Sequence, residues 1–99
     1  MEVGDLTSAL EKTLSLLRES ESSAWAGLSV EEIIRQLEGE LDKARNSQPI
    51  DLKQLGLLFG PTGSLQEISI DNGWANEFLE ISKIMDRYTK ANELAKLWK

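Results

Sequence analysis

The chain is predicted to fold as an all-α domain, a small bundle of four to five helices that ends in a long C-terminal helix. Apolar residues recur every three or four positions over three long stretches, which is the spacing that places them on one helix face. Proline occurs only twice, so little of the chain is barred from helix. The length of 99 residues suits a single helical domain over residues 1–99.

The first helix is expected over residues 5–20. Its leucines recur at spacings of four, four and three, which places them on one face: Leu6, Leu10, Leu14 and Leu17. Asp5 or Ser8 is expected to cap the start of this helix. Ser8 has Glu11 three residues later, which is the pattern of a capping box.

N-cap residues mark the next two helices. Ser29 and Glu32 form a capping box at the start of the second helix. Leu28, just before this cap, is expected to pack against Ile33 as a hydrophobic staple. Asp51 is expected to cap a short third helix.

The stretch after the third helix allows two structures. Residues 60–63 have the Pro and Gly positions of a type I turn. Residues 64–73 then form either a helical turn, with Ser64 at a capping-box position and Gly73 at its end, or part of a β-hairpin over 57–70. The helical turn is the preferred prediction, and the hairpin would make the fold α+β.

A long last helix is expected from about Trp74 to Leu97, with Asn72 as its candidate cap. Its apolar residues keep a helical spacing: Trp74, Phe78, Ile81, Met85 and Tyr88. About 24 residues at 1.5 Å each span roughly 36 Å. Because the first two helices are shorter, the C-terminal turns are expected to overhang the bundle.

The chain contains neither cysteine nor histidine. It therefore has no thiol nucleophile and no zinc–thiolate site, and it lacks both the commonest general base and the commonest transition-metal ligand. The glycines at 60–63 lack the Lys of a nucleotide-binding P-loop, and residues 71–73 lack the alternating acids of a calcium loop. We therefore expect no enzyme activity, no metal and no cofactor.

The net charge of −6 disfavours nucleic acid as a partner. The charge is unevenly distributed, because residues 1–82 contain fifteen acids and six bases, whereas residues 83–99 contain two acids and five bases. No apolar run reaches the length of about 18 residues that a membrane span needs. The first residues also lack the apolar segment of a secretory signal. The expected location is the cytoplasm, without membrane contact.

Seven residues are candidates for a protein interface. Acids of the second helix would meet a basic partner by charge complementarity. Trp25 lies in the linker before this helix, and tryptophan is enriched at interface hot spots. The expected overhang supplies three further apolar residues. The candidates are Glu31, Glu38, Asp42, Trp25, Leu94, Leu97 and Trp98.

Residues 61–79 carry a family resemblance. The segment from Pro61 to Ser69, followed by Asn72-Gly73-Trp74 and Glu77-Phe78-Leu79, resembles part of a family of short bacterial proteins classed as a domain of unknown function. The resemblance covers about a fifth of the chain and implies a bacterial origin. It implies no activity and no binding residues.

The favoured hypothesis is a non-catalytic protein-binding module. One alternative is an acidic inhibitor of a basic partner, of the immunity or antitoxin type, and another is a homodimer formed through the C-terminal helix. A third is a carboxylate-based hydrolase that would use Glu31 with Glu38, or Glu77 with Glu80. Such an enzyme needs its acids in an apolar cleft beside aromatic residues.

Overall fold

The structure is a computed structural model, and its described residues contain five α-helices. It describes the backbone of residues 3–21, 27–60 and 63–97, and the side chains of residues 6–21, 27–60 and 63–88. The helices are α1 (Val3–Arg18), α2 (Val30–Arg45), α3 (Leu52–Phe59), α4 (Ser64–Asp71) and α5 (Ala75–Leu97). No strand occurs within the described ranges. The all-α prediction is therefore confirmed, and 64–71 is helical rather than part of a hairpin.

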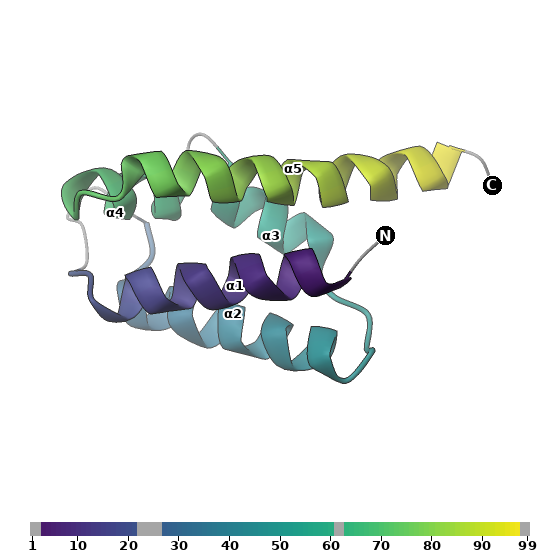
Figure 1. Cartoon of the computed structure of the whole chain (residues 1–99), viewed down its shortest axis with the longest axis horizontal. Coiled ribbons are helices and arrows are strands. Elements are labelled where there is room, and N and C mark those ends of the chain that lie inside the picture. The colour runs from purple at the N-terminus through teal and green to yellow at the C-terminus, as the bar shows by residue number, and fades with distance from the viewer. Residues whose placement is uncertain (1–2, 22–26, 61–62, 98–99) are drawn as a thin grey trace.

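The helices form an elongated bundle of 42 × 25 × 20 Å. α1 packs against both α2 and α5, while α3 and α4 pack against α5 and against each other. Figure 1 shows α5 running along the whole length of the molecule, with α1 and α2 beside each other on the opposite side. One end of the bundle holds α4 and the start of α5, and the other holds the start of α1 and the connection from α2 to α3.

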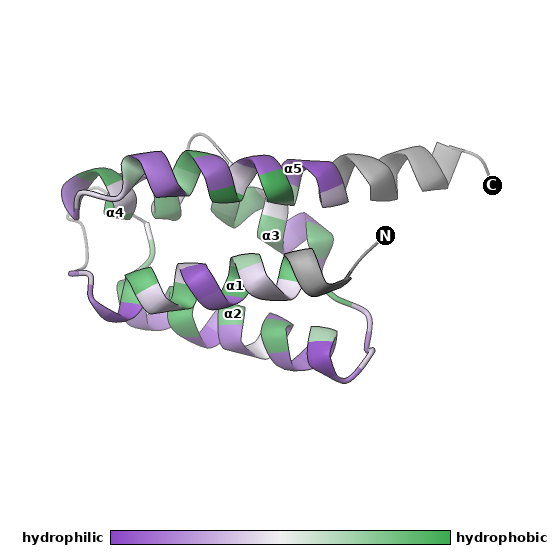
Figure 2. Ribbon diagram, viewed as in Figure 1, coloured by the Kyte–Doolittle hydropathy of each residue, from purple (hydrophilic) through white to green (hydrophobic). Residues whose placement is uncertain are grey.

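The apolar faces expected from the sequence meet in one core. Hydrophobic and hydrophilic residues alternate along each described helix in Figure 2, as in amphipathic helices. The short α3 joins the core through Phe59, whose ring stacks on that of Phe78 with centroids 6.4 Å apart and planes 4° from parallel. Buried members of the predicted faces include Leu6, Leu10, Leu14, Leu17, Ile33, Leu37, Leu41, Trp74, Phe78, Ile81, Met85 and Tyr88.

Two predicted helix caps are confirmed. The Ser29 side chain accepts a hydrogen bond from the backbone N–H of Glu32 at 3.2 Å. Leu28 is half-buried against the core, as the hydrophobic staple requires. The Asp51 carboxylate accepts from the backbone N–H of Gln54 at 3.0 Å, which starts α3.

The predicted capping of the first helix is wrong. α1 begins at Val3, so Asp5 and Ser8 both lie inside the helix instead of before it. Leu6 and Ala9 are 2% and 4% exposed, and placing both on the buried face requires helical backbone before Ser8. Tertiary burial therefore overrides the local capping pattern.

Ser64 and Asn72 also have roles other than the predicted ones. α4 begins at Ser64 itself after Gly63, and the Ser64 hydroxyl accepts from the backbone N–H of Leu28 at 3.1 Å. Asn72 ends α4 instead of starting α5, because its side-chain amide donates to Ile68 O at 2.9 Å. Gly73 follows with φ 79°, a left-handed conformation that closes α4 as predicted.

Candidate functional site

One end of the bundle is held together by hydrogen bonds between segments far apart in sequence. The indole N–H of Trp74 donates to the Ser20 hydroxyl at 2.9 Å. The Asn72 amide donates to Glu21 O at 2.8 Å and accepts from Glu21 N at 3.0 Å, as a paired backbone would. These bonds join the end of α1 to the turn before α5, and we call Ser20, Glu21, Asn72 and Trp74 the closed end.

The opposite end of the bundle carries an apolar groove of about 420 Å³. We call it the end groove, and it lies between the start of α1, the connection from α2 to α3, and α5. Among the residues whose side chains are described, none that lines it is charged. The described lining consists of Leu6, Ala44, Ser47, Gln48, Pro49, Ile50, Leu52 and Tyr88. Such a surface suits the apolar face of a partner helix, because it offers shape and apolar area with few groups to orient a polar substrate.

The backbone after α2 forms one wall of the end groove. Ser47 has φ 55°, which is left-handed and unusual for a residue with a side chain. Around it, Ser47 N donates to Ala44 O at 3.4 Å and Gln48 N donates to Lys43 O at 2.8 Å, the two bonds of a Schellman motif. Glycine normally occupies this position, so Ser47 holds the chain in a strained turn beside the groove.

A buried carboxylate fixes the next part of the same wall. Glu40 is 3% exposed. It accepts from the backbone N–H of Asp51 at 3.2 Å and lies 3.1 Å from Lys43 Nζ. This contact fastens the start of α3 to α2 and so positions Ile50 in the groove. Glu40 therefore has a structural role.

The last turns of α5 extend past the end groove. α5 has 23 residues and α1 has 16, which correspond to about 35 Å and about 24 Å of helix. The two helices meet at the closed end, where Trp74 bonds to Ser20. The difference in length, about 10 Å, therefore lies at the other end. Figure 1 shows α5 continuing beyond the start of α1.

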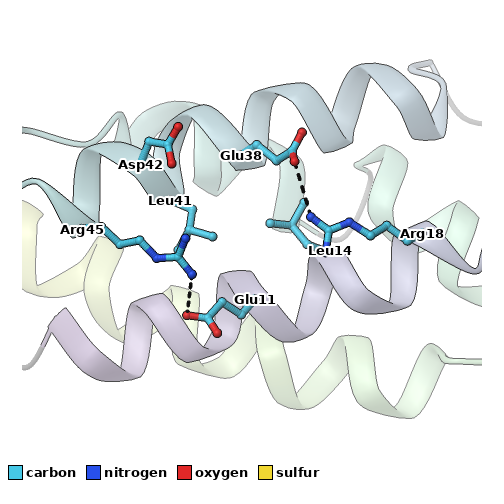
Figure 3. A pocket seen from close by; sticks show the side chains of 7 residues that line it. All are labelled: Glu11, Leu14, Arg18, Glu38, Leu41, Asp42 and Arg45. Carbon is cyan, nitrogen blue, oxygen red and sulfur yellow. Dashed lines mark hydrogen bonds and ion pairs between the residues drawn. The ribbon is translucent and has the colours of Figure 1, made fainter.

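A second groove, of about 620 Å³, lies between α1 and α2 and is charged (Figure 3). Two ion pairs cross it, Arg18 with Glu38 at 3.4 Å and Arg45 with Glu11 at 3.1 Å. The four side chains are 51–57% exposed, so water screens both pairs and each contributes at most about 1 kcal/mol. The arginines partly neutralise the acids, which lowers the attraction of this groove for a basic partner.

The structure describes the side chains of three of the seven interface candidates, and the charged groove brings two of these three together. Glu31, Glu38 and Asp42 are all exposed on α2. Glu38 is paired with Arg18, and Asp42 lines the charged groove together with two arginines, whereas Glu31 lies outside this groove. Trp25 and Trp98 fall outside the described residues. Leu94 and Leu97 belong to α5, and their side chains fall outside the described ones.

The carboxylate pairs considered for hydrolysis do not lie in an apolar cleft. Glu31, Glu38 and Glu80 are exposed, and Glu77 is half-buried. Glu80 lies 3.6 Å from Lys83, with both side chains more than 70% exposed. These four carboxylates therefore lack the buried, apolar surroundings that are typical of a general acid.

Sequence reasoning did not find the end groove or the role of Glu40. Glu40 follows Leu37 by three positions and Ile33 by seven, so an acid on the apolar stripe of α2 was a signal that it is buried with partners. The groove had no such signal, since its lining comes from four separate stretches of chain.

No protein-family model, curated protein or solved structure matches the chain. Within the described ranges, no helix is both long and apolar enough to cross a membrane. Among the same residues, no three acidic side chains lie close enough together to hold a metal ion. The functional inference therefore depends on the geometry of the chain itself.

Proposed function

We propose that the chain is a non-catalytic protein-binding module that binds a basic amphipathic helix in the end groove. The observation that carries this proposal is the groove itself, an apolar surface of about 420 Å³ at one end of the bundle whose described lining residues carry no charge. Helices bind such grooves by inserting apolar residues spaced three or four apart.

The charge distribution supports a basic partner. Residues 1–82, which supply the whole bundle except residues 83–97 of α5, carry fifteen acids and six bases. A basic helix that approaches the groove is therefore attracted by the field of the bundle, which raises the association rate and disfavours acidic competitors.

The end groove is a better binding site than the acids of α2. The ion pairs of Glu38 and Glu11 already use part of the charge that an immunity-type inhibitor would present to its target. We place the contact of highest binding energy in the apolar groove, with the acids contributing to attraction at a distance. The resemblance of residues 61–79 to a bacterial family suggests the bacterial cytoplasm as the location.

The experiment compares partner binding by three forms of the full chain. Gln48→Arg with Pro49→Arg places two charges on exposed positions of the end groove. Glu19→Gln with Glu31→Gln is the control, because it changes the net charge by the same +2 at exposed positions outside the groove. Proteins retained by each immobilised form are quantified by mass spectrometry.

The proposal predicts a partner that the wild-type and control chains retain equally and that the groove variant retains at least about tenfold less, a loss of about 1.4 kcal/mol in binding. Equal retention by all three forms would contradict binding at the end groove. Release of the partner by the control variant alone would instead locate binding at the acids near the closed end.

A further inference from the structure

We infer that the helix bound in the end groove is the C-terminal part of α5 from a second copy of this chain, which makes the protein a reciprocal homodimer. This inference rests on the function proposed above and identifies the partner of the same groove. Three observations support it. They are the position of the overhang next to the groove, the charge and sequence of the overhang, and the two-fold symmetry that a groove and an overhang on the same chain allow.

The overhang and the end groove lie at the same end of the bundle. Tyr88 of α5 lines the groove together with Leu6 of α1. Since α1 begins only three residues before Leu6, the backbone of α5 beyond about residue 91 lies past the end of α1. Each copy therefore presents a groove and, next to it, a helix that extends away from its own bundle (Figure 1).

The overhang also has the chemistry that the groove selects. Beyond residue 91 the chain carries two bases, Lys96 and Lys99, and one acid, Glu93, a balance opposite in sign to the fifteen acids and six bases of residues 1–82. Four apolar residues, Ala91, Leu94, Ala95 and Leu97, fall within the last seven positions of α5. A second copy thus supplies a helix that is both apolar and basic, as the apolar groove and the acidic bundle require.

In a two-fold symmetric dimer, the groove and the overhanging helix of each copy can both be bound. In a two-fold pair the same two surfaces meet twice, so the α5 of each copy occupies the groove of the other. The exchange doubles the area that a single helix buries in a single groove, which brings the pair closer to the roughly 1,200–2,000 Å² of stable interfaces. The reciprocal arrangement therefore explains why groove and overhang occur on one chain.

The experiment measures molar mass by light scattering during size exclusion, over a range of loading concentrations. It uses the wild-type chain, the groove variant Gln48→Arg with Pro49→Arg, a chain lacking residues 94–99, and the control Glu19→Gln with Glu31→Gln. Circular dichroism establishes that each form is folded. A milder groove variant, Gln48→Arg alone, replaces the double variant if the latter does not fold.

The expected result is a dimer for the wild-type and control chains, and a monomer for the groove variant and the truncated chain. An equimolar mixture of these two monomers is expected to form a weak heterodimer, because the truncated chain keeps its groove and the groove variant keeps its helix. One of the two contacts is then restored. Size exclusion with one form labelled by a dye detects this species.

Three outcomes would overturn the inference. The first is a monomeric wild-type chain at all concentrations, and the second is a groove variant that remains dimeric, which would show pairing between α5 helices alone. The third is a mixture that forms no heterodimer. A monomeric wild-type chain that still retains another protein through the end groove would refute self-association and leave the proposed binding module intact.

Discussion

The two ends of the bundle are built from different chemistry. At the closed end, Trp74 and Asn72 tie the α4–α5 turn to residues at the end of α1 more than 50 positions earlier, through hydrogen bonds of 2.8–3.0 Å. At the other end, the lining of the end groove presents apolar side chains. The first end fixes the arrangement of the helices within the chain, and the second is the end at which we propose that another helix binds.

The two ends also differ in how they use left-handed backbone. At the closed end the residue with positive φ is Gly73, which adopts this conformation without steric cost. Beside the end groove it is Ser47. Left-handed backbone at residues other than glycine tends to occur near functional sites.

The largest effect is expected from Trp74→Ala at the closed end. The side chain is 5% exposed and its indole N–H bonds to Ser20, so truncation loses packing and a hydrogen bond, at a cost of about 3–5 kcal/mol in the free energy of unfolding. Leu57→Ala is the control, because Leu57 is 70% exposed and should change stability by no more than about 0.5 kcal/mol. Urea denaturation measures both. Similar losses for both variants would mean that the closed end is not a stabilising centre.

A smaller loss of stability is expected when only the hydrogen bonds between distant segments are removed. Asn46 and Asn72 each end a helix and each donate to the carbonyl four residues earlier, at 2.8 and 2.9 Å. Only Asn72 also pairs with the backbone of Glu21. Because a net hydrogen bond contributes about 0.5–1.5 kcal/mol, Asn72→Ala should destabilise the fold by about 1–2 kcal/mol more than Asn46→Ala.

Thermal and urea unfolding of these two variants provide the test. If both substitutions lower the free energy of unfolding equally, the hydrogen bonds between Asn72 and Glu21 contribute nothing to stability. The difference in stability between the two ends must then come from apolar packing alone.

The smallest effect concerns the two left-handed residues. Ser47→Gly is expected to stabilise the chain by about 0.5–1 kcal/mol, since relief of strain exceeds the added backbone entropy of glycine. Gly73→Ala, with φ 79° at this position, is expected to destabilise it by about 1–2 kcal/mol. Opposite signs in the two melting temperatures would support the contrast between the ends. A loss of stability in Ser47→Gly would contradict the assignment of strain to Ser47.

The sequence predicted the fold and the order of its helices because the apolar periodicity of α1, α2 and α5 is a local property of each segment. It also predicted the caps Ser29 and Asp51. The predicted N-caps Ser8, Ser64 and Asn72 were wrong. Each local pattern is compatible with a cap, but a contact with another part of the chain places the residue differently. For example, burial of Leu6 extends α1 to residues before Ser8, and the Ser64 hydroxyl accepts a hydrogen bond from the backbone N–H of Leu28.

The candidate site was less accessible to sequence reasoning. The overhang of the last helix followed from helix lengths alone, and the structure bears it out. The end groove joins Leu6, Ala44, the stretch 47–52 and Tyr88. Nothing in the periodicity of one helix indicates which residues of another will lie beside it, so this surface required the three-dimensional arrangement.

The central claim, that the end groove binds the overhanging helix of another copy, is tested most directly by intermolecular paramagnetic relaxation. The chain contains no cysteine, so Lys96→Cys accepts a single nitroxide label on an isotopically unlabelled chain. This chain is mixed and refolded with ¹⁵N-labelled wild-type chain. We expect broadening of the amide signals of Leu6, Ser47 and Gln48, with those of the closed end unchanged. Broadening confined to the closed end, or none at all, would contradict this claim.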